Sequence, residues 1–471
     1  MKPSLESLLS ESLNVLKDLN APPQSSAPGP TESLDLITHE QVRNEVLEHI
    51  NDDRDAIANG TYQVDVEEIV QQNEIDHAVM RSEISEMRNM VGAVVTAMEM
   101  LTCVSSMESI EPDAVSMANT AIGNISVLAG EPNVPAFVVE DGKMTTASME
   151  SIVDFIVGTL KKMKAWIKEK WENIVMGMRR GIRTDQTTRL RIEAIQKRIS
   201  SLGDDHGIPA KQMRYQADLI GYLYRDGSPI QFDKSSLATA MKEALDITAF
   251  ANKSISGDAA GRSMAISENI GKVLMTRDSI DAEKMLRDMF GKSVGKNPSE
   301  GYLTYGKELT GGITFLDPYL AAGRPSRDTE WIAALADYIS IPFGHHRLRK
   351  SGMISTKANT LEEISVMLDT AIEILESDAY TDEEWYTDIN EAWREAHGMY
   401  DRMIGMVTNN HLPQLNNELW RALDVACSAM FVIVERAYYQ TLYMRAPSFR
   451  LIQGLVYVCE EQVKAYVAVN R

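Results

Sequence analysis

The stretch TTASMESIVDFIVGTLKKMKAWIKEKW, Thr145–Trp171, joins two parts of the chain that differ in charge and decides how both are organised. It opens with small polar residues and a Glu, and it continues into a run rich in Lys and Trp. Apolar residues recur at helical spacing on one face of this run, and the lysines lie mostly off that face. The sequence therefore predicts a strongly amphipathic basic helix, with a break expected at Gly181.

Acidic residues are concentrated in the part of the chain before this junction. Met1–Glu150 holds 26 acidic and 7 basic residues, a net charge of −19 out of −21 for the 471 residues. Ser151–Arg471 therefore carries only −2, and the 12 basic and 5 acidic residues of Ser151–Ser200 give that stretch a charge of +7. Such an asymmetry indicates an acidic segment that is separable from the remainder.

Two helical patterns precede the junction, at about 36–59 and 64–102. In the second, apolar residues alternate by four and three, which is the spacing of a heptad seam. This seam consists of Met80, Ile84, Met87, Val91, Val94, Met98 and Leu101. Because only three heptads are kept, we expect a helix packed in a bundle within the chain rather than an intermolecular coiled coil. The residues 138–150 (VVEDGKMTTASME) are expected to form an exposed connection, where proteases cut.

The remaining patterns favour a mainly α fold: helical bundles in two or three domains, with one small β-hairpin in the middle region. The expected divisions are an amphipathic N-terminal helix (1–20), a Pro/Ser-rich linker (21–35), an acidic helical segment (36–150), basic amphipathic helices (151–206), a mixed middle domain (207–350) and a C-terminal helical bundle (351–471). The stretch YLTYGKELTGGITFL, with its Gly311-Gly312 pair, predicts the hairpin.

Periodicity and capping motifs locate several individual helices. Periodicity predicts helices at about 211–224 and 235–251. Thr360 with Glu363, and Thr381 with Glu384, are candidate capping boxes that would each open a helix.

Neither catalytic nor cofactor-binding nor metal-ligating residues are expected, and the chain is not expected to be an enzyme. The three cysteines are too few and too scattered for a disulfide framework or a zinc knuckle, and are expected to be small buried apolar residues. His345 and His346 are adjacent, so they cannot share a helix face as paired zinc ligands do.

The basic helix admits three interpretations. In the first, Trp166 and Trp171 pack into the core of a bundle. In the second, they lie at the headgroup level of a membrane. In the third, the helix faces DNA, and its positive charge neutralises phosphates without recognising the base sequence. Packing in the core is the simplest of the three. The lysines concerned are Lys161, Lys162, Lys164, Lys168 and Lys170.

Three tetrapeptides share the pattern small residue, any residue, Glu, Ser: SLES at 4–7 and SMES at 106–109 and 148–151. In an extended peptide, residues two apart project to the same side, so a protease cleft can read the small residue and the Glu together. The third copy coincides with the charge boundary. The candidate processing site is therefore Ser148, Glu150 and Ser151, and a second candidate is Ser106, Glu108 and Ser109.

The run A-S-M-E-S-I-V-D-F-I followed by W-I-K-E-K-W resembles the processing junction of internal head proteins of giant tailed bacteriophages of the phiKZ-like group. The resemblance covers about 30 residues and the acidic-to-neutral layout. It implies a prohead protease that cuts after Glu150, an acidic propeptide (36–150) that is discarded, and a mature chain that begins at Ser151. The N-terminal helix is similar to the capsid-targeting segments of such proteins.

The resemblance implies a virion structural protein, made in the host cytoplasm and packaged in the capsid beside DNA. Its expected partners are the prohead protease, capsid shell or prohead core proteins, and DNA bound non-specifically after maturation. The alternative is an ejected effector, an enzyme or host-binding protein with its active module in 200–471 and a transient membrane contact on ejection. A third interpretation is a helical scaffold unrelated to phage. The propeptide hypothesis requires that the first 150 residues are not locked into the core of the remainder.

Overall fold

The computed structural model describes residues 39–50, 54, 57, 66–105, 112–113, 115–116, 118–120, 123, 136–140, 143–202, 207, 209, 212–216, 220–225, 228–276, 280–285, 308–311, 313–316, 344–347, 353–409 and 412–469. The predicted N-terminal helix, the linker and the second candidate processing site therefore lie outside the described residues.

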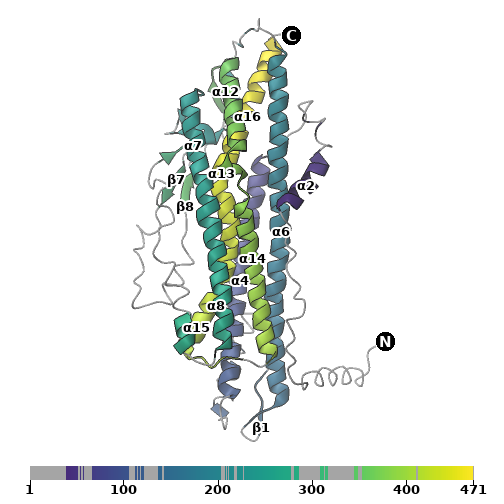
Figure 1. The fold of residues 1–471 in the computed structure, drawn as a ribbon, viewed down its shortest axis with the longest axis vertical. Helices are drawn as coiled ribbons and strands as arrows, with labels where there is room; N and C mark the ends of the chain where they lie inside the picture. The colour runs from purple at the N-terminus through teal and green to yellow at the C-terminus, as the bar shows by residue number, and fades with distance from the viewer. Residues whose placement is uncertain are drawn as a thin grey trace, which may run out of the picture. The chain divides into compact units, whose positions relative to one another are not determined.

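Helices form most of the described chain, so the predicted mainly α fold is confirmed (Figure 1). They are α2 (His39–Ile50), α4 (Val66–Ser105), α6 (Thr146–Ser200), α7 (Lys234–Phe250), α8 (Gly257–Met275), α12 (Leu361–Glu376), α13 (Asp378–Thr381), α14 (Glu384–Thr408), α15 (Asn417–Glu435) and α16 (Thr441–Val469). A turn of π-helix joins α7 to α8 (Ala251–Ser256), and another joins α15 to α16 (Arg436–Gln440).

Short antiparallel strand pairs supply the rest of the regular structure. They are β1 (Val139–Glu140) with β2 (Lys143–Met144), β3 (Met213–Gln216) with β9 (Met353–Thr356), β4 (Tyr224–Arg225) with β5 (Ser228–Pro229), and the sheet β6 (Glu308–Leu309), β7 (Ile313–Leu316), β8 (Gly344–Arg347). The predicted hairpin is confirmed as β6–β7. Gly311 in its turn has φ of 88°, a left-handed conformation that favours glycine.

Two local predictions in this region were incomplete or wrong. The helix expected at 211–224 is replaced by strand β3 and a 3₁₀ turn, Gly221–Leu223. Strand β3 pairs with β9, which is far away in sequence, and local periodicity cannot reveal such a partner. The other strand pairs were also missed, because strands of two to four residues are too short to show an alternating pattern.

The C-terminal helices begin at well-defined caps. Thr360 and Glu363 form the predicted capping box: Thr360 Oγ1 accepts from the Glu363 N–H (3.1 Å), and a Glu363 carboxylate oxygen accepts from the Thr360 N–H (2.8 Å). The second predicted box is wrong. Thr381 ends α13, and the Glu384 N–H at the start of α14 donates to Asp382 instead.

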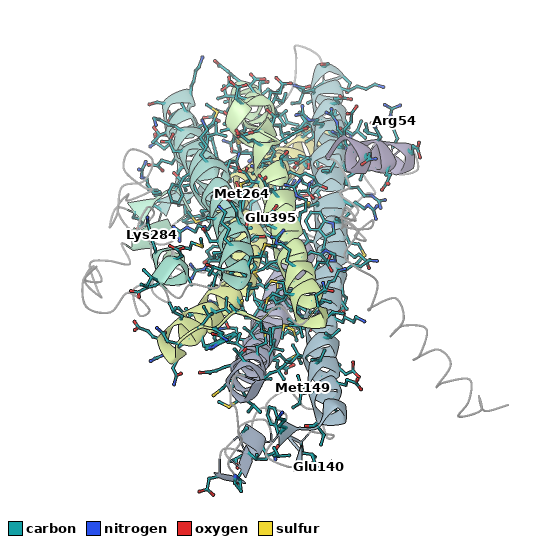
Figure 2. All side chains as sticks on the ribbon, turned by 60° about the horizontal axis from the view of Figure 1, so that its bottom comes forward. Arg54, Glu140, Met149, Met264, Lys284 and Glu395 are labelled. Carbon is teal, nitrogen blue, oxygen red and sulfur yellow. The ribbon has the colours of Figure 1, made fainter. Side chains whose placement is uncertain are left out.

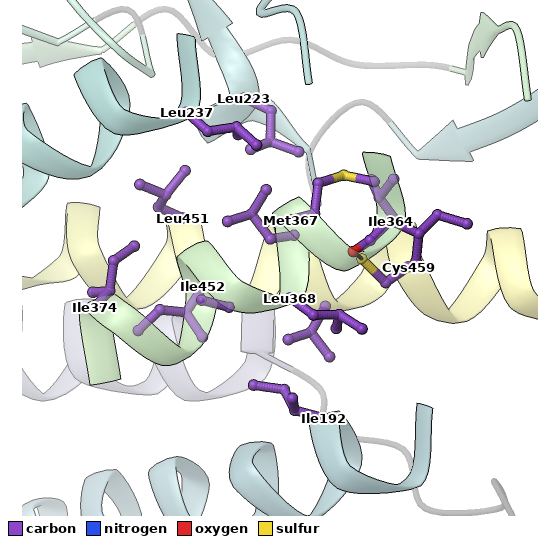
Figure 3. Packing of buried hydrophobic residues seen from close by; sticks show 14 of the residues in the cluster. Ile192, Leu223, Leu237, Ile364, Met367, Leu368, Ile374, Leu451, Ile452 and Cys459 are labelled. Carbon is purple, nitrogen blue, oxygen red and sulfur yellow. Dashed lines mark hydrogen bonds between the residues drawn. The ribbon is translucent and has the colours of Figure 1, made fainter. Parts of the chain in front are cut away.

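One apolar cluster links helices from distant parts of the sequence. Figure 3 shows α12 packed against α16, with α6 contributing from below. The labelled members include Ile192, Ile364, Met367, Leu368, Leu451, Ile452 and Cys459, all at most 2% exposed. Of the three cysteines, Cys427 and Cys459 are buried as expected, whereas Cys103 is exposed.

The predicted divisions within 36–471 do not separate packed bodies, and this corrects the expected domain organisation. Helix α14 packs on α8 and α6, and α15 packs on α4 and α8, so the C-terminal helices do not form a bundle of their own. Leu36–Arg471 forms one compact unit. The reason is that each amphipathic helix buries its apolar face against whichever complementary face the chain supplies, near or far in sequence.

Helix α6 continues without interruption through Gly181, so the predicted break there is wrong. Buried residues on both sides, such as Met178 and Thr184, hold the helix in register with its neighbours. This tertiary packing outweighs the roughly 1 kcal/mol by which a glycine disfavours a helix.

Two glycines of α6 should respond oppositely to alanine substitution. A Cβ added at Gly177 would collide with the buried Tyr438 hydroxyl, whereas one added at Gly158 would meet no atom within 4 Å. We expect Gly177→Ala to lower the free energy of unfolding by about 1–3 kcal/mol through overpacking. Gly158→Ala should raise it by about 0.5–1 kcal/mol through helix propensity. Urea unfolding of both variants measures the difference, and equal effects would contradict the close approach of Tyr438.

Candidate functional site: the junction at Glu150 and the basic helix

The junction is exposed at Val138, Glu140 and Glu150, as the sequence predicts, but it is ordered as a turn into α6. Strands β1 and β2 form a small hairpin, and α6 begins directly after Thr145. Thr145 is the N-cap, because its hydroxyl accepts from the Ser148 N–H at 3.3 Å. Its own N–H donates to Val138 O at 2.9 Å. The small polar residues before the basic run therefore serve as a helix start.

Ser148 anchors the first turn of α6 to the preceding segment. Its side chain is buried, and its hydroxyl donates to Ala136 O (2.9 Å) and accepts from the Val138 N–H (3.0 Å). Figure 2 shows the neighbouring Met149 together with Glu140 at the same end of the helices. The small residue of the candidate processing motif is thus held against the segment just before the hairpin.

Glu150 and Ser151 are exposed, in contrast to Ser148. Residues two apart on a helix point to nearly opposite sides, because each residue turns the helix by about 100°. A protease that reads Ser148 and Glu150 together in extended form can therefore act only after the first turns of α6 unwind. The structure places the predicted site residues next to one another but not in a cleavable conformation.

Loosening this turn should speed proteolysis. Ser148→Ala keeps the small residue and removes two hydrogen bonds, each worth about 0.5–1.5 kcal/mol. If cutting follows the population of the open form, we expect a Glu-specific endoprotease to cut at Glu150 about 5–150 times faster. The rate is measured as the appearance of the Ser151 N-terminus. Ser200→Ala, at the far end of the same helix, is the matched control, and equal rates in the two variants would contradict the anchoring role of Ser148.

The five predicted lysines fall into two groups. Lys161, Lys162 and Lys168 are exposed. Lys164 Nζ lies 2.7 Å from Asp401 of α14, and Lys170 Nζ lies 2.7 Å from Glu83 of α4. Burial lowers the pKa of Lys170, but its hydrogen bonds to Glu83 and Glu169 more than offset this, and the net pKa is raised. Lys170 is thus held charged by a carboxylate of the acidic segment.

The tryptophans of the basic helix belong to the core, as the simplest of the three interpretations predicts. Trp166 and Trp171 are 8% and 3% exposed. Both rings contact Trp393 of α14, with centroids 6.5 Å and 6.2 Å away. The Trp166 indole N–H donates to Glu83 at 2.9 Å. In this fold, therefore, neither ring is available to a membrane interface.

The acidic segment covers the basic helix, but it does so as part of the core. Glu83 of α4 pairs with Lys170, and Glu45 of α2 pairs with Arg179 at 2.7 Å. The predicted heptad seam of α4 is confirmed as a buried face, packed on α15 and α6. Its seven residues, Met80, Ile84, Met87, Val91, Val94, Met98 and Leu101, are at most 7% exposed.

This packing counts against the predicted separability of the acidic segment. The net charge of a segment determines how it interacts with solvent and ions. Where the segment packs is determined by its apolar residues, here the seam of α4. The partner roles of Glu83 and Glu45 were not predicted. A signal existed for Glu83, which lies one residue before the seam residue Ile84 and so at the edge of the buried face.

Comparison with known proteins identifies no relative. A scan against protein-family models, a search of curated proteins and a search of solved structures each found no match. Among the described helices, none combines the length and the apolar content that a bilayer crossing requires.

Proposed function

We propose that this chain is a structural protein of a giant tailed phage, made as a precursor in the host cytoplasm, cut after Glu150 by the prohead protease, and packaged in the capsid beside DNA. The observation that supports it best is the coincidence, at one bond, of three features. The small-x-Glu motif, the charge boundary and a pair of exposed residues, Glu150 and Ser151, all fall where the acidic segment joins the basic helix. The proposal needs no catalysis by the chain itself.

The charge difference gives the cut a physical purpose. Packaged DNA is a dense polyanion, and a segment of −19 is repelled by phosphates over a Debye length of about 10 Å at 0.1 M salt. Before packaging, Glu83 and Glu45 neutralise Lys170 and Arg179 of the basic helix. Loss of the segment would leave a chain with a net charge of −2. Lys170 and Arg179 would then lack their carboxylate partners and could contact DNA phosphates non-specifically.

The buried seam of α4 counts against this proposal, which requires that the first 150 residues are not locked into the core of the remainder. A cut after Glu150 ends the covalent tether but leaves the apolar contacts of α4 with α15 and α6 in place. While the chain is intact, the linker holds α4 near α15 and α6 at an effective concentration in the millimolar range. After the cut this advantage is lost, and another protein can compete with α4 for the same face. We propose that capsid shell or prohead core proteins take the place of α4 on this face in the particle.

Removing the carboxylate at the cut should block maturation. Charge-assisted hydrogen bonds to the Glu150 carboxylate would hold it in the protease cleft, and an amide cannot replace them. When Glu150→Gln is produced together with the prohead protease, we expect no chain that begins at Ser151, even if the second candidate site at Glu108 is still cut. Glu172→Gln, an exposed position of the same helix that lacks a small residue two places before it, should be processed normally. Normal processing of Glu150→Gln would place the cut elsewhere.

The alternative, an ejected effector with its module in 200–471, has one observation in its favour. A cavity with buried charged groups is lined by residues of 177–189, 375–386 and 442–449. It lies outside the 207–350 region, where sequence patterns place the mixed domain. A small-molecule site is compatible with a structural role as well.

A further inference from the structure

A cavity of about 260 Å³ lies between α6, the turn from α13 to α14, and α16. Most of its wall is apolar or aromatic, with Leu375, Trp385, Tyr386 and Phe449 among the lining residues. Arg43 of α2 also borders it. A concave, mainly apolar space with a few converging polar groups is the usual form of a small-molecule site.

The charged groups on the wall are arranged around Asp185. The Tyr380 hydroxyl donates to Asp185 Oδ1 at 2.7 Å. In the described part of the chain, no donor reaches the second carboxylate oxygen, Oδ2. Asp185 is partly exposed and lines the cavity, so its second carboxylate oxygen can accept a hydrogen bond from a ligand there.

The neighbouring arginines are already engaged by the protein. Arg445 donates to Asn252 Oδ1 (2.5 Å) and to Tyr380 O (2.7 Å), and its guanidinium lies over the Trp385 ring at 4.7 Å from the centroid. Arg189 donates to Leu375 O at 2.6 Å. These contacts fix both guanidinium groups as parts of the wall, which leaves the carboxylate as the polar group best placed to receive a ligand.

We propose that this cavity binds a small amine, a ligand that joins a protonated amino group to a flat apolar body, with the amino group donating to Asp185 Oδ2 and the body lying against Trp385 and Phe449. Ammonium groups favour a carboxylate beside aromatic rings. An ammonium at Asp185 would lie near the charges of Arg445 and Arg189, but both guanidinium groups already donate to oxygens of the protein, so the amino group can take the free carboxylate oxygen. The proposal does not depend on cleavage after Glu150.

Such binding should depend on pH through Asp185. Burial raises the pKa of Asp185 to about 6, although the Tyr380 hydrogen bond and the charges of Arg445 and Arg189 lower it. The other charged groups that border the cavity are Arg43, Asp382 and Glu383. The carboxylate is ionised above about pH 6 and protonated below it, so amine binding should be complete at pH 7.5 and weaken as the pH falls through 6.

Calorimetric titration of the full-length protein with tryptamine tests the proposal. At pH 7.5 we expect saturable binding, and at least tenfold weaker binding of indole-3-acetate, which replaces the amine by a carboxylate. Asp185→Asn should weaken tryptamine binding at least tenfold. Asp369→Asn, which removes an exposed carboxylate of α12 outside the cavity, should leave it unchanged.

The unaltered protein supplies a second readout in case Asp185→Asn does not fold. Tryptamine affinity should fall about tenfold between pH 7.5 and pH 5, following the ionised fraction of a group with a pKa of about 6. Tryptamine binding that is absent at millimolar concentration, independent of pH, or no stronger than that of indole-3-acetate would overturn the proposal.

Discussion

A chain that begins at Ser151 and is produced alone is expected to aggregate or to form a loosely packed state, because it lacks α4. The seven seam residues of α4 are at most 7% exposed, and each buried apolar side chain of this size contributes about 1.5–3 kcal/mol. Together they match or exceed the roughly 5–15 kcal/mol by which a typical domain is stable. Far-UV and near-UV circular dichroism and size-exclusion chromatography of Ser151–Arg471 measure the effect.

Supplying residues 1–150 as a separate chain is the matching control. If α4 is a packed element, co-production of the two fragments should restore a soluble complex with near-UV signals like those of the intact chain. A monomeric, cooperatively unfolding Ser151–Arg471 would show instead that α4 is dispensable. That result would return the acidic segment to the role of a loosely attached tail.

Substitution of Val94 by Asp should produce the largest effect of any single change in α4. Val94 has no exposed surface, and its helix packs on α15 and α6. Burying an unpaired carboxylate there belongs to the class of substitutions that lower the free energy of unfolding by about 4 kcal/mol or more. Urea unfolding followed by fluorescence measures it, since the Trp166, Trp171 and Trp393 cluster reports on the core.

Val79→Asp is the matched control for Val94→Asp. Val79 occupies the same helix and is 49% exposed, so the same chemical change there should stay within about 0.5 kcal/mol. Comparable losses in the two variants would contradict the register of α4, which places one valine inside and the other outside.

The features that sequence reasoning predicted correctly are those with a strong local signal. The seam of α4 follows from apolar residues spaced by four and three, and the capping box at Thr360 follows from a four-residue motif. The β6–β7 hairpin follows from paired glycines, one of which adopts the left-handed conformation that its turn needs. In each case the physical cause lies within a few turns of helix or a single loop.

The features that were missed depend on contacts between distant segments. The sequence shows Glu83 and Lys170 as two solvated charges, and only the packing of α4 on α6 brings them to 2.7 Å. The same holds for Asp185, Tyr380 and Arg445, which converge from three helices on one cavity. Ser148 could not be assigned from sequence for another reason. The short polar stretch around it fits both the start of a helix and a protease motif, and only the structure shows that it starts a helix.

The net charge of the acidic segment and its separability from the rest of the chain have different physical origins. The change from −19 to −2 is a property of the sequence, and the proposed incompatibility with packaged DNA rests on it. Separability is a property of the fold, and the buried seam of α4 opposes it. The proposed removal of the acidic segment and its buried packing are consistent under one sequence of events. The segment assists folding, remains bound after the cut, and leaves when a capsid protein displaces it.

Quantitative mass spectrometry of purified phage particles tests the central claim most directly. We predict a mature N-terminus at Ser151 and strong depletion of peptides from residues 1–150 relative to those from 151–471. A chain that retains Met1, with peptides from both parts in equal abundance, would contradict the proposed maturation and leave an intact helical scaffold as the better description.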